Sequence, residues 1–330
     1  MGATPHAQSL LDLADRVEVA WACTRSAERA ASFAARFPFP VTRDVETVLA
    51  DPTINCVLIA TPPATHLELA TRCAAAGKHV LLEKPLEVTL AKSETLVERC
   101  AAAGVRLGVV FQHRFRPGAR RLAALVESGA LGALAIANVQ VPWWRPQSYY
   151  DVPGRGTRAR DGGGVLITQA IHQLDLFLSL AGAVSQATAF AGTTALHRME
   201  TEDVVAGALR FANGALGAVM ATTAAYPGFG ERIELVGTRG TAVLADGLLE
   251  AQLHDGTVVR AGSQGGGGGG ADPMAFSHDA HRAVLADFLD AVDAGTDPLA
   301  SGRAALAVHR LIEALLASAA RGMPVHLPAG

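Results

Sequence analysis

The chain has 330 residues, of which 50% are hydrophobic and 5% are aromatic, and its formal net charge is −3. This length exceeds the roughly 250–300 residues at which a single hydrophobic core stops growing, so we expect two domains. The charge balance and the lack of a basic stripe exclude nucleic acid and an anionic membrane surface as expected partners, and no run of about 18 apolar residues predicts a membrane-spanning helix.

Residues 1–115 alternate short apolar runs with helical patterns. Strands are expected at residues 17–23, 56–60, 79–82 and 106–111. The helices between them are expected at residues 26–37, 44–51, 65–77 and 90–103, with N-caps at Ser26, Asp44 and Thr65. Uninterrupted apolar strands separated by helices predict a parallel sheet that is covered on both faces.

The pattern changes after Pro117. A helix at residues 118–128 is followed by a strand at 133–141, a loop at 142–164 and a helix at 166–180. Strand-like runs broken by glycine predict a mostly antiparallel sheet with helices on one face, and they lie at residues 204–210, 216–223, 233–236 and 242–245. The six consecutive glycines at 265–270 predict a mobile surface loop, and further helices are expected at 278–294 and 302–321.

The start of the chain lacks a feature that dinucleotide-binding sheets normally have. Such sheets begin with a strand and a Gly-x-Gly-x-x-Gly turn, which holds the pyrophosphate at the N-terminus of the first helix. Here a helix follows Met1 almost at once, so we interpret Gly2 and Ala3 as the remnant of the turn and expect the functional chain to be longer. The first strand is normally central in such a sheet. The alternative is that the chain genuinely starts at Met1 and that another element takes the place of this strand.

The cysteines lie in apolar or helical patterns without Cys-x-x-Cys spacing, at Cys23, Cys56, Cys73 and Cys100. We expect four buried, free thiols in a reducing compartment and place the protein in the cytoplasm. No metal site is expected.

Polar residues follow the predicted strands at the edge where a parallel sheet binds its ligands. These strand ends carry Thr24, Arg25 and Ser26; Thr61, Pro62 and Pro63; Glu83, Lys84 and Pro85; and Gln112, His113 and Arg114. The Lys84 ammonium can donate a hydrogen bond to a substrate oxygen and stabilise a developing alkoxide. Pro85 could contact the nicotinamide. A lysine after a strand can equally be a solvated surface residue, so Lys84 is a candidate only in its context.

That context is a glycine-rich segment that opens the helix expected at 166–180. Three glycines at 162–164 precede it, and Thr168, His172 and Asp175 then recur at i, i+4 and i+7, on one helix face. His172 could accept the proton that leaves as hydride is transferred. The alternative is a histidine that is satisfied within the core, and the presence of Lys84 favours the catalytic interpretation.

Five segments resemble, in this order, the Gfo/Idh/MocA family of glucose–fructose oxidoreductase, inositol dehydrogenase and a rhizopine-catabolism protein. They are Pro-His-Ala at 5–7, Ala-Thr-Pro-Pro-Ala-Thr-His at 60–66, Gly-Lys-His-Val-Leu-Leu-Glu-Lys-Pro at 77–85, Phe-Gln-His-Arg-Phe at 111–115 and the segment at 162–175. The resemblance implies an α/β Rossmann domain for NAD(P), here residues 1–115 with the first strand missing. It also implies an α+β domain with a large, mostly antiparallel open sheet, here residues 116–330, through which a homodimer or homotetramer would form.

The same resemblance implies roles for single residues. Lys84 matches the catalytic lysine of the family and His172 its catalytic histidine. The cofactor-lining segment is matched by Pro62, Pro63 and His66, with Glu83 and Gln112 nearby. The alternative for His66 is a packing role at the start of its helix. The family often has an aspartate four residues before the histidine, where this chain has Thr168, which carries no charge and puts a standard Asp–His proton relay in doubt. Asp175 matches a recurrent helix position that is either structural or catalytic.

The residues after the first predicted strand bear on the choice of cofactor. NAD enzymes usually place Asp or Glu there to bind the ribose hydroxyls, whereas this chain has Thr24, Arg25 and Ser26. A guanidinium and two hydroxyls suit a 2′-phosphate, so NADP is expected in preference to NAD. The alternative is that Arg25 covers the adenine or points into solvent.

The loop at 142–164, together with His113 and Arg114, is the expected substrate wall. Its aromatic residues and arginines are Trp143, Trp144, Tyr149, Tyr150, Arg145, Arg155, Arg158 and Arg160. Aromatic rings suit stacking on a ring and arginines suit a carboxylate or phosphate. This mixture allows a sugar, a sugar acid or an aromatic cis-diol carboxylate. The competing interpretation is a loop that contacts another subunit.

These residues predict a dehydrogenase that transfers hydride between a nicotinamide cofactor and a secondary alcohol or ketone of a sugar, inositol or cyclic diol. Its candidate substrate residues are Lys84, His113, Arg114, Trp143, Thr168 and His172. The alternative is a non-catalytic NAD(P)-binding sensor or scaffold, which Thr168 and the missing glycine turn favour. A third hypothesis is a decaying product that no longer binds the cofactor.

Overall fold

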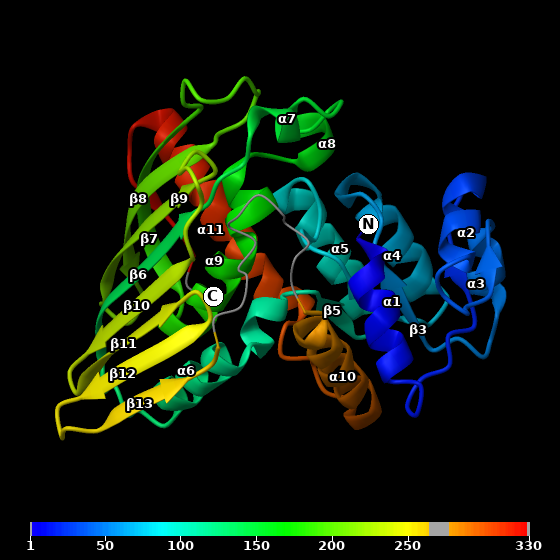
Figure 1. Ribbon diagram of the computed structural model, residues 1–330, viewed down its shortest axis with the longest axis horizontal. Coiled ribbons are helices and arrows are strands. Elements are labelled where there is room, and N and C mark those ends of the chain that lie inside the picture. The colour runs from blue at the N-terminus through cyan, green and yellow to red at the C-terminus, as the bar shows by residue number, and fades with distance from the viewer. Residues whose placement is uncertain (1, 264–276, 329–330) are drawn as a thin grey trace. The chain divides into compact units, whose positions relative to one another are not determined.

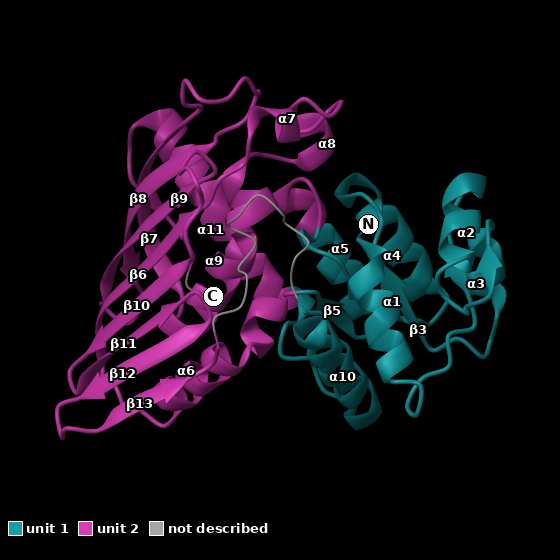
Figure 2. Ribbon diagram, viewed as in Figure 1, with its two compact units in different colours: residues 1–86, 94–110, 277–302 teal, residues 87–93, 111–276, 303–330 magenta. Residues whose placement is uncertain are grey.

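The computed structural model (Figure 1) describes residues 2–263 and 277–328. The predicted glycine loop at 265–270 lies outside these residues. The chain forms two compact units (Figure 2): unit 1 comprises Met1–Leu86, Glu94–Val110 and Ser277–Gly302, and unit 2 comprises Glu87–Ser93, Phe111–Phe276 and Arg303–Gly330. These units differ from a single division after residue 115 in that residues 87–93 and 111–115 group with unit 2 and residues 277–302 with unit 1.

Unit 1 contains short parallel strands in two sheets. One sheet has the order β3 (Cys56–Ile59), β4 (His79–Leu82) and β5 (Leu107–Val109), and the other pairs β1 (Ala22–Cys23) with β2 (Val41–Thr42). The strand predicted at 17–23 is wrong over residues 17–21, since the ladder to β2 begins only at Ala22 and a strand needs a hydrogen-bonded neighbour. The carboxyl ends of β3, β4 and β5 lie at one edge, because the three strands run parallel.

The helices of unit 1 follow the predicted pattern, and two of the three predicted N-caps are confirmed. They are α1 (Ala3–Asp12), α2 (Ala27–Ala34), α3 (Val45–Ala50), α4 (His66–Ala75), α5 (Leu90–Ala102), which begins in unit 2, and α10 (Asp279–Ala294). The caps Ser26 and Asp44 are confirmed, since their side chains accept hydrogen bonds from Arg29 N–H and Glu46 N–H. The predicted Thr65 cap is wrong: this residue already ends a 3₁₀ turn, and its hydroxyl donates to the carbonyl of Pro62 at 2.8 Å.

Unit 2 is built on a nine-stranded, mostly antiparallel sheet (Figure 1), as predicted. Its order is β13-β12-β11-β10-β6-β9-β8-β7-β14, and β6 pairs with β9 in parallel. The strands are β6 (Leu134–Pro142), β7 (Val184–Gly192), β8 (Val204–Phe211), β9 (Leu216–Thr222), β10 (Arg232–Gly237), β11 (Gly240–Ala245), β12 (Leu248–Leu253), β13 (Val258–Ala261) and β14 (Val325–His326).

Three helices cover one face of this sheet. α6 (Pro117–Glu127) packs on β11, β12 and β13, and α9 (Ile171–Ala181) packs on β6. α11 (Gly302–Arg321) lies on the same face, where its Leu315 meets β8 at Gly207. The core of unit 2 therefore lies between these helices and the inward-facing residues of the sheet.

The segment before α9 is more ordered than the loop predicted at 142–164. It contains α7 (Gln147–Tyr150) and α8 (Arg158–Asp161), and a π-helical turn at Leu166–Ala170 leads into α9. Among the described residues, Arg158–Ala181 is the one helical stretch long and apolar enough to cross a membrane, which corrects the expectation that no segment is. Of its most apolar window, 89% is buried inside the protein, as in a core helix.

The four thiols differ in exposure. Cys73 and Cys100 are buried as predicted, and burial raises the pKa of Cys73 to about 11 and that of Cys100 to about 12. The prediction is wrong for Cys23, which is exposed on the two-stranded sheet, and Cys56 is half-buried because β3 is an edge strand among the described residues.

Candidate active site

Lys84 lies directly beyond the buried strand β4. Glu83 N–H donates to Ile59 O at 2.9 Å, which extends the β3–β4 ladder by one residue, and the Glu83 carboxylate accepts a 3.0 Å hydrogen bond from Lys84 N–H. The Lys84–Pro85 peptide is cis. The two hydrogen bonds of Glu83 fix the backbone of Lys84 at the carboxyl edge of the sheet, and the half-buried Lys84 side chain brings a cation there.

The Glu83 carboxylate is itself held by a histidine that sequence reasoning noted only as part of a motif. His6 Nε2 lies 2.7 Å from Glu83 Oε1, and the buried His6 ring packs edge-on against His281, with 5.3 Å between centroids. Burial alone would raise the pKa of Glu83, but the His6 hydrogen bond and the charges of His6 and Lys84 hold that pKa below its usual value. Glu83 is thus an ionised group that positions Lys84.

The side chains of His6, Glu83 and His281 also bring three potential metal-ligand atoms within 4.8 Å of one another. The ligand atoms of a tetrahedral zinc ion stand roughly 3.3 Å apart, which is farther than the 2.7 Å between His6 Nε2 and Glu83 Oε1. A ligating histidine normally donates its second ring nitrogen to a partner, and His6 Nδ1 has none among the described residues. The geometry fits a hydrogen-bonded carboxylate better than a metal centre.

His66, which matches the cofactor-lining segment of the family, has both ring nitrogens next to backbone carbonyls. Its ring is fully buried at the start of α4, with Nδ1 2.9 Å from Pro85 O and Nε2 2.9 Å from Thr61 O. Both ring nitrogens face backbone carbonyls, because the turns after β3 and β4 close around the ring. His66 therefore positions the Thr61 and Pro85 turns.

The other cofactor candidates in the β3 turn and at the start of α1 lie in open positions. Thr61 and Pro62 are exposed after β3, and Pro63 is half-buried. A stiff, exposed turn at the carboxyl edge of a parallel sheet fits the flat face of a nicotinamide cofactor. Ala3 begins α1, and a Cβ added at Gly2 would meet no atom within 4 Å, so open space adjoins a helix N-terminus of the kind that holds a pyrophosphate.

Two of the three residues after β1 make hydrogen bonds within the protein, and the third has an exposed side chain. Ser26 is used as the cap of α2, and Thr24 N–H donates to Thr42 O at 3.1 Å, while the Arg25 side chain is exposed. Arg43, which sequence reasoning missed, follows β2 and donates from Nε to Arg25 O at 3.3 Å. Two exposed arginines thus follow this strand pair. No strand was predicted at residues 41–42, so sequence reasoning had no signal for the second arginine.

In unit 2, His172 lies on α9 within a buried group of rings. Its ring is nearly parallel to that of His113, with 5.0 Å between centroids and 25° between planes, and it lies edge-on to Phe111 at 6.0 Å. His113 Nδ1 lies 3.0 Å from Gln173 Oε1, which orients the His113 ring. His113 is buried, so it supports His172 rather than forming an open substrate wall. Gln112, expected at the cofactor, belongs to the same unit, and its Oε1 is buried without a hydrogen-bond partner among the described residues.

Thr168 stands where the resemblance leads one to expect an aspartate, and its hydroxyl turns back along its own helix to donate to Gly164 O at 2.6 Å. Sequence reasoning missed Glu202, a buried carboxylate at the start of this helix, which accepts a hydrogen bond from Gly164 N–H at 3.1 Å. A Cβ at Gly164 would collide with the carbonyl oxygen of Glu202, so a glycine is required there. An acidic residue just before the apolar strand β8 was the available signal.

Two further substrate candidates, Arg114 and Trp143, are held by contacts with other side chains. Arg114 makes two hydrogen bonds of 2.6 Å to the buried Asp175, one from Nε and one from Nη2. This two-pronged ion pair engages both oxygens of the Asp175 carboxylate. Trp143 is buried with the Arg145 guanidinium 5.3 Å from its ring, so it forms no exposed stacking surface.

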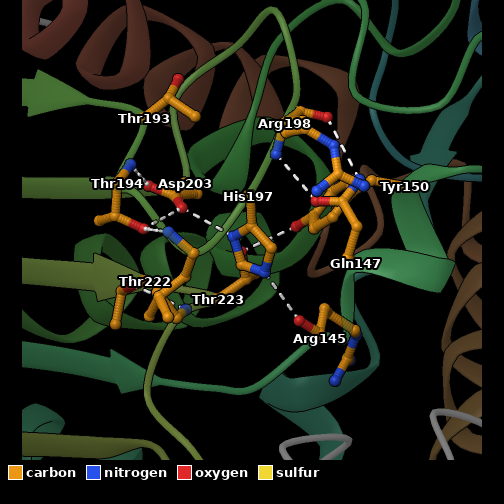
Figure 3. A network of polar contacts seen from close by, with 12 residues as sticks. Arg145, Gln147, Tyr150, Thr193, Thr194, His197, Arg198, Asp203, Thr222 and Thr223 are labelled. Carbon is orange, nitrogen blue, oxygen red and sulfur yellow. Dashed lines mark hydrogen bonds and ion pairs between the residues drawn. The ribbon is translucent and has the colours of Figure 1, made fainter.

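A buried polar network fixes the segment that carries Trp143 (Figure 3). His197 Nδ1 lies 2.7 Å from Asp203 Oδ2, and His197 Nε2 lies 2.8 Å from Arg145 O. Asp203 also accepts hydrogen bonds from the N–H and the hydroxyl of Thr194, at 2.8 and 2.7 Å. Sequence reasoning missed this network, because a loop histidine and an aspartate before a strand carry no periodic signal.

Two family models match successive parts of the chain. The model of an oxidoreductase family with an NAD-binding Rossmann fold matches residues 1–111, and that of the GFO/IDH/MocA C-terminal domain matches residues 119–243. Among similar proteins, the myo-inositol 2-dehydrogenase of Thermotoga maritima is 28% identical over 268 residues, which make up 79% of this chain and 76% of that protein.

Solved structures are similar over nearly the whole chain. The WlbA dehydrogenase from Bordetella pertussis, in complex with NADH and UDP-GlcNAcA, has 28% sequence identity and a TM-score of 0.83, with 99% of this chain and 96% of that chain covered. A levoglucosan dehydrogenase in complex with NADH has 25% identity and a TM-score of 0.88, with 100% and 97% covered. The predicted fold class is confirmed, and the chain belongs to the Gfo/Idh/MocA family of NAD(P)-dependent oxidoreductases.

Proposed function

We propose that this chain transfers hydride between a nicotinamide cofactor and a secondary alcohol or ketone of a sugar, inositol or cyclic diol. In this proposal residues 1–115 bind the cofactor and residues 116–330 bind the substrate. The observation that carries it is Lys84, which Glu83 holds at the carboxyl edge of the β3–β4–β5 sheet. The names of similar proteins, myo-inositol 2-dehydrogenase and levoglucosan dehydrogenase, support a polyol substrate.

Lys84 and His172 are the catalytic residues of this proposal. The bound cofactor supplies the hydride donor or acceptor. The Lys84 ammonium donates a hydrogen bond to the reacting oxygen of the substrate and stabilises negative charge on it. His172 accepts the hydroxyl proton during oxidation and returns it during reduction. Because Thr168 carries no charge, packing against His113 and Phe111 orients the His172 ring.

A substrate screen on the full chain tests this proposal. Sugars, inositols, sugar acids and dihydrodiols are offered with NAD and with NADP, the reduced cofactor is followed by absorbance, and cofactor binding is measured by calorimetry. Turnover of a polyol supports the dehydrogenase. Cofactor binding without turnover of any compound supports a sensor or scaffold instead, and absence of cofactor binding contradicts both.

We propose further that NADP is preferred to NAD. The support is the pair of exposed arginines, Arg25 and Arg43, because guanidinium groups bind a phosphate in a forked geometry. Arg25→Ala is expected to raise the KM for NADPH about tenfold, as for loss of a charge-assisted hydrogen bond, and to leave the KM for NADH within about twofold. Arg29→Ala, at an exposed position on α2, is the matched control. An unchanged ratio of the two KM values in Arg25→Ala contradicts the preference.

We propose that the open face of the nine-stranded sheet joins two or four copies of the chain. Large apolar residues are exposed on this face, namely Ile136 on β6, Met220 on β9 and Phe190 on β7, the last with 82% of its surface exposed. Exposed apolar patches of this kind mark association surfaces. Phe190→Glu is expected to give monomers in sedimentation experiments, and an unchanged species contradicts the proposal.

We also place the protein in the cytoplasm. Its four free cysteines suit a compartment in which thiols stay reduced.

A further inference from the structure

Unit 2 contains a cavity of about 160 Å³ next to the helix that carries His172. The cavity is lined by the segment of 149–164, by the start of this helix and by Met199. Its polar lining side chains are Tyr149, Tyr150, Arg155, Arg160, Asp161, Thr168 and Gln169. Thr168 precedes His172 by four residues, so the cavity lies about one helical turn from the proposed proton acceptor.

The wall of this cavity is fixed by hydrogen bonds around Gly156. Gly156 N–H donates to Asp161 Oδ2 at 2.7 Å, and its carbonyl accepts from the Thr201 hydroxyl at 3.0 Å and from Glu200 N–H at 3.2 Å. Gly156 has a φ of +72°, and a Cβ there would press on Met199, so this turn favours glycine. The arginines on either side of the turn are therefore carried by a defined backbone.

The two arginine side chains are also held in place. The Arg155 guanidinium carbon lies 4.0 Å from the centroid of the Tyr149 ring, and Arg155 Nη1 donates to Tyr149 O at 3.1 Å. Arg160 Nη1 donates to Pro153 O at 2.5 Å, and its Nε lies 3.7 Å from Asp161 Oδ1. A guanidinium has five N–H donors in a planar fork, so an arginine anchored in this way can still bind a ligand through the rest of its fork.

The charges of the lining residues indicate a ligand with one negative charge. Arg155 and Arg160 contribute two positive charges and Asp161 one negative charge, which leaves one positive charge uncompensated. A carboxylate carries one negative charge and fits the guanidinium fork, whereas a phosphate monoester carries about −1.5 to −2 at pH 7. The other arginines of the predicted wall do not line the cavity: Arg145 is buried against Trp143, and Arg158 is exposed beside Glu200.

We infer that this cavity binds the carboxylate of a sugar acid, so the substrate is a carboxylated polyol rather than a neutral sugar or inositol. Arg155 and Arg160 hold the carboxylate, and Thr168 and Gln169 contact hydroxyl groups of the same molecule. The inference rests on the proposed dehydrogenase function, because it names the substrate class of that enzyme. The cavity itself can be tested without turnover.

Binding to the full chain is measured by calorimetry with NADP present. The probes are D-gluconate and D-glucuronate, the neutral D-glucose and myo-inositol, and D-glucose 6-phosphate. The sugar acids are expected to bind about tenfold more tightly than the neutral compounds, as for one added charge-assisted hydrogen bond. Arg155→Met is expected to weaken D-gluconate binding about tenfold to hundredfold and to leave D-glucose within about twofold. Arg198→Met is the control, because Arg198 is exposed and does not line the cavity.

A second variant and a set of distinct outcomes keep the inference open to refutation. Arg160→Gln repeats the test on the other guanidinium, and thermal unfolding checks that each variant is folded. Equal binding of acidic and neutral probes, or an unchanged preference in both variants, overturns the inference. Tighter binding of D-glucose 6-phosphate than of D-gluconate overturns the carboxylate assignment. Arginine-dependent binding of sugar acids, combined with no turnover of any compound in the screen, supports the cavity and refutes the dehydrogenase, so the two proposals can fail separately.

Discussion

The position of the Lys84 backbone depends, through Glu83, on a residue that is far away in sequence. One oxygen of Glu83 binds Lys84 N–H and the other binds His6 Nε2, so a residue of α1 positions the backbone of the catalytic candidate. Sequence reasoning could identify Lys84 and Glu83, because a polar tripeptide after a buried strand is visible in one segment. It could not pair Glu83 with His6, because 77 residues separate them and only the fold brings them together.

Glu83→Gln is expected to lower the free energy of unfolding at pH 7 by about 1.5–3 kcal/mol, the contribution typical of hydrogen bonds to a charged group. The folded-state pKa of Glu83 lies below its unfolded value, so its stabilisation is present above the unfolded pKa and is lost as the pH falls through the folded pKa. The difference between wild type and variant in urea unfolding should therefore shrink in acid. Glu68→Gln, at an exposed position on α4, is the control. A difference that grows as the pH falls contradicts this role.

Asp175→Asn is expected to destabilise the protein by about 3–5 kcal/mol, because it leaves the charge of Arg114 buried without its carboxylate. The double variant Arg114→Met/Asp175→Leu should recover part of that loss. The pH dependence of kcat in the folded single variant should match the wild type. Wild-type stability combined with an altered pH profile would instead place Asp175 in the reaction.

The helix that carries Thr168 and His172 begins at a junction of distant segments. Glu202 binds Gly164 N–H with its carboxylate and Val165 N–H with its backbone carbonyl, so the strand β8 and the helix start are joined just before Val204. The glycines and the helix could be predicted from local pattern. Glu202 could not, because its partner lies 38 residues away.

Gly164→Ala is expected to cost about 1–3 kcal/mol of stability, as for overpacking, since the added Cβ collides with the Glu202 carbonyl. The kcat should fall as well, because the collision displaces the helix that carries His172. Gly192→Ala in β7 is the matched control, since a Cβ there meets no atom within 4 Å. Equal melting temperatures for the two variants would show that the helix start tolerates a side chain.

The elements that matched their predictions most closely are those with long, regular patterns. The helix predicted at 302–321 has those bounds, and the strands β8 to β11 lie where alternating apolar runs indicated them. The strand at 17–23 was predicted too long, because its pairing depends on Val41 and Thr42 rather than on its own residues. The spacing of hydrophobic residues therefore predicts that a strand or helix exists. Pairing with residues that are distant in sequence decides where a strand begins and ends.

The whole molecule distributes its candidate residues over both units. Unit 1 carries Lys84 and the cofactor candidates at its strand ends, and unit 2 carries His172 and the arginine-lined cavity. Two domains could be predicted from chain length. The path of the chain between them could not, because the grouping of residues 277–302 with unit 1 depends on contacts such as that between α10 and α1.

His309, which is buried on α11, should make the stability of the protein depend on pH. Burial lowers the pKa of His309 to about 4, from an ordinary value of 6.5. Between these values the unfolded state binds the proton more readily, so stability is full above pH 6.5 and falls as the pH drops towards 4. At 1.36 kcal/mol per pH unit, the loss is about 3 kcal/mol.

The variant His309→Gln, which cannot titrate, tests this dependence by urea unfolding across the same pH range. Its stability should vary less with pH than that of the wild type. His326→Gln, at an exposed position on β14, should keep the wild-type slope. Identical slopes for the wild type and His309→Gln would show that His309 is not the group responsible.

Lys84 is the residue on which the proposed chemistry depends most, and the rate of hydride transfer tests it most directly. Single-turnover rates are measured for the wild type and Lys84→Met, with cofactor and the best substrate of the screen both saturating. We predict a fall of about 10²–10³-fold, the effect of removing one donor to a developing oxyanion, with the cofactor Kd nearly unchanged. Lys92→Met, at a half-exposed position on α5, should keep the wild-type rate. A Lys84→Met rate within about threefold of the wild type, at full cofactor occupancy, would contradict the central role of Lys84.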